Sequence, residues 1–170
     1  MRLASVLLLF AALSGGIANA EDVYQDPRAF LEEVFAGDVP APHKLWVKPD
    51  LKDRIRAIMG HDLGALRIRY WARDGRSAWI LEDIGKEQFI TTGLVVADGA
   101  LIDVRVLIYR ESRGWEVKYP AFTDQFRGAR LTDELALDRG IDGISGATLS
   151  VHALTRLARL ALLLDRHAGA

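Results

Sequence analysis

Alternating apolar and polar residues in the middle of the chain constrain the fold more than any other feature of the sequence. Residues 66–71 and 102–109 each alternate with a period of two, which is typical of half-buried β-strands. The dipeptides Asp74-Gly75 and Asp98-Gly99 follow or precede such segments and are strong hairpin signals. The pattern therefore predicts an antiparallel meander of about four strands.

Helix signals flank this region on both sides. Asp26, followed by a proline, is expected to cap a first helix. Asp50 is expected to cap a second helix, which Gly60 ends. A strongly apolar last helix is expected from about Leu149 to His167. Together these elements predict an α+β fold, in which a twisted antiparallel sheet carries helices on one face.

The first twenty residues differ in composition from the rest. Arg2, the apolar run of residues 3–13 and the small residues Ala18-Asn19-Ala20 are typical of a secretory signal peptide. The alternative is a retained N-terminal anchor, but the run is shorter than the roughly 20 apolar residues of a membrane span. We therefore expect cleavage after Ala20, a location outside the cytoplasm, and a single domain at residues 21–170.

Composition excludes several classes of function. The formal net charge of −1, without a basic stripe, argues against binding to nucleic acid. The chain has no cysteine, which excludes disulfides, cysteine-ligated iron–sulfur clusters and thioether-linked haem. Its four histidines lack metal-ligand spacing, so we expect no metal site. We also find no acid–base pair or nucleophile set, and expect no catalytic residues.

A stretch of small and hydroxyl-bearing residues, DGISGATLS, precedes the last helix at residues 142–150. One hydroxyl, from Thr148 or Ser150, would be enough to cap that helix. Gly143 and Gly146 leave room for something bulky, and free N–H groups at a helix start attract anions such as phosphate. A serine-hydrolase elbow is the other interpretation, but the Gly-x-Ser-x-Gly spacing is missed by one residue. The stretch therefore predicts a phosphate-binding site with a hydroxyl at its centre.

The same stretch resembles the flavinylation motif of the FMN-binding domain family. That motif reads Asp, a small residue, any residue, Ser or Thr, Gly, Ala, Thr, any residue, and Ser or Thr. The matching positions are Asp142, Gly143, Ser145, Gly146, Ala147, Thr148 and Ser150. The resemblance implies that FMN is attached covalently, by a phosphoester bond to Thr148, and that these residues surround it.

The resemblance extends upstream over roughly residues 89–164. Glu111, Ser112 and Gly114 resemble the family's Glu-Thr-x-Gly, with Arg113 in place of the usual proline. The resemblance implies that this loop, and Glu111 and Gly114 in particular, lies beside the isoalloxazine ring. The alternative is a plain surface turn.

Other residues are weaker candidates for the flavin site. Residues 85–93, with Thr91 and Thr92, could line the other edge of the ring or simply begin a strand. His152 could approach the phosphate, although a position on the helix surface is the simpler interpretation. Asp142 could assist magnesium or transferase binding, or cap the turn. Four aromatic residues could stack on the flavin, although lone aromatics more often belong to the core: Trp71, Trp79, Trp115 and Tyr119.

The resemblance also implies a function. The family includes the extracytoplasmic flavoprotein subunits of the sodium-pumping NADH:quinone reductase and of the Rnf complex, and a periplasmic FAD:protein FMN transferase attaches their flavin. We therefore expect a periplasmic electron-transfer flavoprotein, membrane-associated or free, whose partners are that transferase and a membrane or periplasmic redox protein. The alternatives are a secreted binding module that docks a membrane redox partner, and a small flavin-dependent reductase of iron or quinone.

Overall fold

A computed structural model describes residues 21–169 of the chain. The expected signal peptide at residues 1–20 lies outside the described residues, so cleavage after Ala20 stays a prediction. Among the described residues, no helix is both long enough and apolar enough to cross a membrane.

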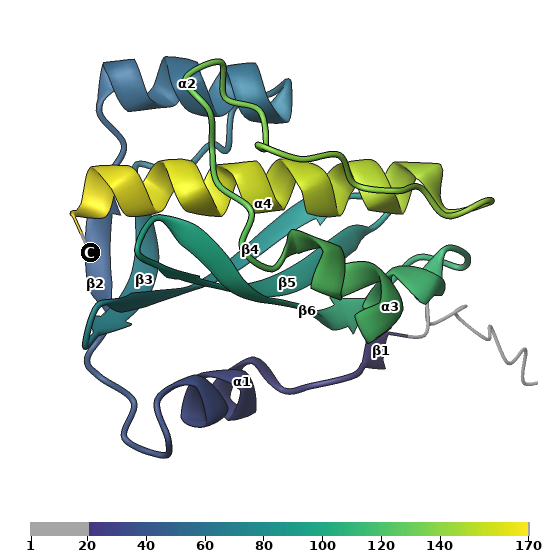
Figure 1. The fold of residues 1–170 in the computed structure, drawn as a ribbon, viewed down its shortest axis with the longest axis horizontal. Helices are drawn as coiled ribbons and strands as arrows, with labels where there is room; N and C mark the ends of the chain where they lie inside the picture. Colours follow the sequence, from purple (N-terminus) through teal and green to yellow (C-terminus); the bar gives the residue numbers. More distant parts are fainter. Residues whose placement is uncertain (1–20, 170) are drawn as a thin grey trace, which may run out of the picture.

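The centre of the fold is an antiparallel sheet of six strands in the order β1-β6-β5-β4-β3-β2 (Figure 1). The strands are β1 (Asp22–Val23), β2 (His43–Trp46), β3 (Arg67–Arg73), β4 (Arg76–Ile84), β5 (Phe89–Ala97) and β6 (Ala100–Tyr109). The expected meander corresponds to β3–β6, and the α+β prediction is confirmed. The two additional strands, β1 and β2, lie at the edges of the sheet and are too short to show a period-two pattern.

Both expected hairpin turns form where their sequences predict them. Asp74 and Gly75 join β3 to β4 with φ angles of 51° and 73°. Asp98 and Gly99 join β5 to β6 with φ angles of 51° and 69°. Two consecutive positive φ angles match the twist of the flanking strands, which is why Asp-Gly is favoured there.

Helices cover both faces of the sheet (Figure 1). The α-helices are α1 (Pro27–Val34), α2 (Pro49–Met59), α3 (Pro120–Thr123) and α4 (Thr148–Ala168), and two 3₁₀ helices, η1 (Trp115–Lys118) and η2 (Asp124–Phe126), flank α3. Helix α4 lies along one face with α2 beside it, whereas α1 lies on the opposite face. The expectation of helices on one face is therefore wrong for α1.

The burial of β5 explains why helices cover both faces of the sheet. Residues Ile90–Val96 of this strand are all buried, so both faces of the sheet need cover. On the α1 side, Phe30 packs so closely that a Cβ on Gly93 would lie 2.7 Å from its ring. On the α4 side, Trp79, Leu94 and Leu157 belong to the larger core and are fully buried. Burial of this kind contributes about 25 cal/mol per Å² of apolar surface.

Two of the three expected helix ends form as predicted. Asp26 caps α1 and accepts hydrogen bonds from the N–H groups of Arg28 and Ala29, at 2.8 and 3.2 Å. Gly60 ends α2 in the left-handed region, with φ 78°. The expectation for Asp50 is wrong: Lys48 is the N-cap, Pro49 takes the first helical position, and Asp50 lies in the first turn.

Candidate functional site

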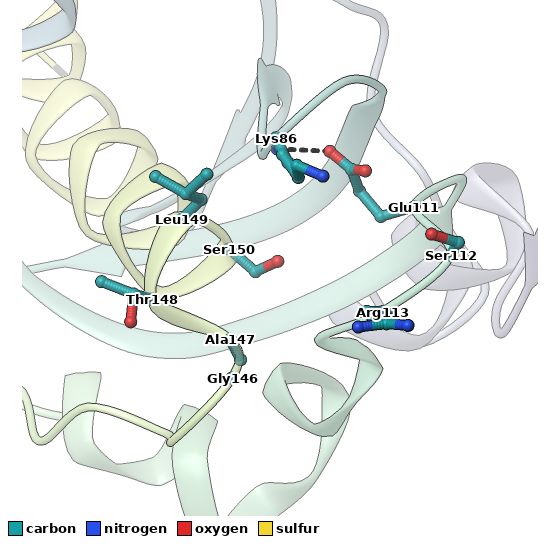
Figure 2. Close-up of a pocket in the computed structure, with 9 residues that line it drawn as sticks. All are labelled: Lys86, Glu111, Ser112, Arg113, Gly146, Ala147, Thr148, Leu149 and Ser150. Atoms are coloured by element: carbon teal, nitrogen blue, oxygen red, sulfur yellow. Dashed lines mark hydrogen bonds between the residues drawn. The ribbon is translucent and has the colours of Figure 1, made fainter.

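A cavity of about 570 Å³ lies at one end of the sheet, where three segments of the chain converge (Figure 2). The β4–β5 loop, the loop after β6 and the start of α4 line it through Lys86, Glu111, Ser112, Arg113, Gly146, Ala147, Thr148, Leu149 and Ser150. The fold thus brings together the two segments that the sequence singled out, which are some 30 residues apart. The volume is that of a pocket for a cofactor-sized molecule.

The start of α4 presents a hydroxyl that the helix itself does not use. Ala147 is the N-cap, and no side chain accepts a capping hydrogen bond there. The alternative in which Thr148 or Ser150 caps the helix is therefore wrong. Thr148 is the first residue of α4 and is exposed at the cavity, whereas Ser150 is buried. The first N–H groups of a helix lack intrahelical partners and carry positive partial charge, which favours an anion beside them.

Tyr109, at the end of β6, holds two walls of the cavity together. Its phenol oxygen donates a hydrogen bond to the carbonyl oxygen of Arg113 at 2.5 Å and lies 2.9 Å from Ser150 Oγ. Since the phenol proton is used on Arg113, Ser150 is the donor in the second contact. Burial raises the pKa of Tyr109, the hydrogen bond from Ser150 opposes this, and the charges of Glu111 and Glu116 add to it. The phenol is therefore a neutral donor at physiological pH.

Gly114 is required by this packing. The residue is buried and has a φ angle of +84°, which side chains with a Cβ rarely adopt. A Cβ on it would lie 2.9 Å from Ser150 Oγ and 3.0 Å from the Tyr109 phenol oxygen. Gly114 is not among the residues that line the cavity. The absence of a side chain at this position allows the loop after β6 to pack closely against α4.

Glu111 ties the β4–β5 loop to the end of β6. Its Oε1 atom accepts hydrogen bonds from the N–H groups of Glu87 at 2.7 Å and Gln88 at 2.9 Å, and from that of Lys86 (Figure 2). A Cβ on Gly85 would lie 2.9 Å from the same oxygen, so the loop closes tightly around the carboxylate. Glu111 thus shapes the cavity wall, and its predicted contact with flavin stays a prediction.

The motif residues divide into two groups. Gly146, Ala147, Thr148 and Ser150 line the cavity, whereas Asp142, Gly143 and Ser145 are exposed on the approach to it. The N–H group of Asp142 donates to Gln125 Oε1 at 2.7 Å, which anchors the beginning of this approach to η2. A Cβ at Gly143 or Gly146 would meet no atom within 4 Å, so the surface before Thr148 is open.

Of the weaker candidate segment at residues 85–93, Lys86 lines the cavity, whereas the threonines and the aromatic candidates do not. Thr91 and Thr92 are buried within β5, and the Thr91 hydroxyl donates to Glu82 at 2.5 Å. Trp79 is fully buried and stacks on Tyr70, at 4.7 Å between ring centroids. The remaining candidates are also absent from the lining of the cavity: Trp71, Trp115, Tyr119 and His152.

Sequence reasoning missed two features of the site. Tyr109 reads as an ordinary residue of an alternating strand, and nothing in the sequence shows that its hydroxyl reaches α4. Arg113 stands out only as a departure from the family pattern, although it contributes a cationic side chain to the cavity wall. Within residues 21–169, no group of three or more His, Asp or Glu side chains is arranged to hold a metal ion.

Comparison with known proteins identifies the segment that contains the cavity. Residues 85–163 match the family model described as FMN-binding domain. The match begins at the β4–β5 loop and ends within α4, so it includes every residue that lines the cavity. Searches of the curated proteins and of the solved structures gave no match.

Proposed function

We propose that this chain, which belongs to the FMN-binding domain family through residues 85–163, is a periplasmic electron-transfer flavoprotein that carries FMN on Thr148. One observation carries the proposal: Thr148, the first residue of α4, is exposed and lines the cavity, and its hydroxyl serves no capping role. Bound FMN would accept and donate one or two electrons, and the protein would position the flavin ring.

The residues at the cavity fit the cofactor. The volume of about 570 Å³ suits a molecule of this size. A phosphodiester on Thr148 would place its negative charge beside the N-terminus of a 21-residue helix, where the helix dipole favours an anion. Arg113 and Lys86, on the other walls of the cavity, add positive charge.

Attachment requires a phosphoryl transfer to which this chain contributes the acceptor. The Thr148 oxygen forms a bond to the FMN phosphorus of FAD, the diphosphate bond breaks, and AMP leaves. The hydroxyl proton passes to a base of the transferase, which also supplies the magnesium ion. The open surface at Gly143 and Gly146 supports this reading, because a transferase must reach the hydroxyl.

Flavin retained after denaturation tests the attachment site. The chain is produced together with an FAD:protein FMN transferase, and fluorescence and intact mass are measured on the unfolded protein. Thr148→Val, which keeps the side-chain shape, is expected to abolish both signals, and Ser145→Ala, the matched hydroxyl deletion, is expected to keep them. Covalent flavin in Thr148→Val would show that the bond lies elsewhere.

Electron carriage and location need separate tests. NADH alone is expected to reduce the flavin slowly, because the chain has no dinucleotide-binding fingerprint. Rapid saturable oxidation of NADH, or turnover with soluble iron or quinone, would favour a reductase instead. A colourless protein after production with the transferase would favour a binding module. Protein isolated from its natural source is expected to begin at Glu21, and a retained Met1 would contradict export with cleavage.

A further inference from the structure

We propose that Arg113 tunes the flavin site, because its guanidinium supplies an uncompensated positive charge that favours the anionic, reduced form of the ring. The inference rests on flavin occupying the cavity, as proposed above, but it does not depend on the bond to Thr148. It concerns a position at which this chain has arginine where the family it resembles has proline.

The charged residues that line the cavity are Lys86, Glu111 and Arg113, and two of them are already engaged. Glu111 accepts three backbone hydrogen bonds from the β4–β5 loop through Oε1. The Lys86 ammonium lies 3.1 Å from the carboxylate of Glu87. Neither Glu111 nor Arg113 forms an ion pair in the described part of the chain, but Glu111 accepts backbone hydrogen bonds, whereas the Arg113 side chain has no hydrogen-bond partner there. The Arg113 guanidinium is therefore free to interact with a ligand.

Two other arginines near the cavity form ion pairs, unlike Arg113. Arg110, three residues earlier, pairs with Glu21 at 2.7 Å. Arg156, two turns into α4, pairs with the buried carboxylate of Asp83 at 2.7 Å. Those two charges are neutralised by their partners, whereas the charge of Arg113 is available to a ligand.

The backbone of Arg113 is fixed while its side chain is exposed. The Tyr109 phenol donates to the Arg113 carbonyl, which anchors the residue to the end of β6. Figure 2 shows the Arg113 side chain across the cavity from Thr148, below Ser112. Arg113 and Thr148 thus lie on different walls of the cavity that the flavin would occupy.

A cation at this wall acts on the charge that reduction creates. Addition of two electrons and one proton leaves the flavin ring with one net negative charge, and a nearby guanidinium lowers the free energy of that state relative to the oxidised ring. The same charge favours the adduct of sulfite with the ring, because sulfite adds as an anion and brings a negative charge with it. Exposure to solvent weakens both effects, and salt screens them.

The test compares Arg113→Gln with Arg69→Gln, which removes the same charge from an exposed position on β3 at a different cavity. The flavin-loaded proteins are titrated with dithionite against a reference dye, and sulfite binding is followed by loss of visible flavin absorption. Arg113→Gln is expected to lower the midpoint potential and to weaken sulfite binding by roughly twofold to fivefold, the range of an exposed ion pair. The difference is expected to shrink at high salt, and Arg69→Gln is expected to match the unsubstituted protein.

Three outcomes would overturn the inference in distinguishable ways. If Arg113→Gln binds flavin fully but keeps its potential and sulfite affinity, the charge of Arg113 has no influence on the ring. If Arg113→Lys, which keeps the charge, lowers the midpoint potential and the sulfite affinity as much as Arg113→Gln does, the effect comes from the shape of the side chain. If the unsubstituted protein binds no flavin, the proposed function fails and this inference fails with it.

Discussion

The hydroxyl of Ser150 lies 2.9 Å from the phenol oxygen of Tyr109, and this contact joins the start of α4 to the end of β6. Both atoms are buried, and the same phenol donates onward to the carbonyl of Arg113. Two segments that line the cavity, the loop after β6 and the start of α4, are thus held together through Tyr109 by two hydrogen bonds. Neither Tyr109 nor Ser150 needs to touch a flavin in order to shape the site.

Removal of this contact is expected to destabilise the protein. Tyr109→Phe should lower the free energy of unfolding by about 1–2 kcal/mol, because it leaves the buried Ser150 hydroxyl without a partner. Ser150→Ala should cost about 0.5–1.5 kcal/mol, because the phenol loses one hydrogen bond but still donates to the Arg113 carbonyl. Urea unfolding of both variants and of the double variant measures the coupling between them, which should reach at least about 0.5 kcal/mol. Thr155→Val is the control, since its hydroxyl bonds only to Val151 within the same helix. Strictly additive effects would contradict the link.

Gly114→Ala is expected to destabilise the protein more than Gly60→Ala. Both glycines have left-handed φ angles, +84° and +78°, and alanine there costs roughly 1–2 kcal/mol. Around Gly60 the space is open, whereas a Cβ at Gly114 would lie 2.9 Å from Ser150 Oγ. Thermal or urea unfolding of the two variants separates backbone strain from this clash, and equal losses would show that the loop yields without disturbing α4.

The parts of the fold that sequence reasoning predicted depend on local chemistry. The Asp74-Gly75 turn adopts positive φ angles because of its own two residues, and the last helix begins at Thr148, within the small-residue stretch and one residue before the expected start at Leu149. Helix α1 covers the second face because residues Ile90–Val96 of β5 are all buried. The apolar run of β5 does not reveal on which side of the sheet the helix lies.

The parts of the site that sequence reasoning missed depend on distant contacts. Tyr109 and Ser150 are separated by 41 residues, and Glu111 is separated from the loop that it holds by 23 to 25 residues. The resemblance of Glu111, Ser112 and Gly114 to the family's Glu-Thr-x-Gly implied a contact between Glu111 and flavin. The use of Glu111 as an acceptor for three backbone N–H groups becomes visible only when β4, β5 and β6 are assembled.

Glu111→Ala is expected to loosen the β4–β5 loop. The N–H groups of Lys86, Glu87 and Gln88 would lose their common acceptor, and their amide hydrogens should exchange faster with solvent. Hydrogen exchange measured by NMR or mass spectrometry checks this directly. The matched control is Glu87→Ala, because that side chain is exposed and pairs only with Lys86. Unchanged exchange in Glu111→Ala would show that the loop is held by its own conformation.

Asp165→Asn is expected to change how the stability of the protein depends on pH. Asp165 is buried, and its carboxylate accepts a hydrogen bond from the Ser77 hydroxyl at 2.5 Å, which in turn accepts one from Trp79 Nε1 at 2.7 Å. Burial raises the pKa of Asp165 above its ordinary value of 3.8, and the hydrogen bond from Ser77 opposes that change.

The sign follows from proton binding. Because the folded state holds this proton more tightly than the unfolded state, Asp165 favours folding fully below about pH 3.8, and that contribution is lost as the pH rises through the raised folded pKa. Asparagine has no such proton and can still accept from Ser77. The free energy of unfolding of Asp165→Asn, relative to the unsubstituted protein, should therefore increase between about pH 4 and pH 7. Urea unfolding across this range, with exposed Asp133→Asn as the control, measures the difference, and a constant offset would mean that Asp165 does not titrate differently on folding.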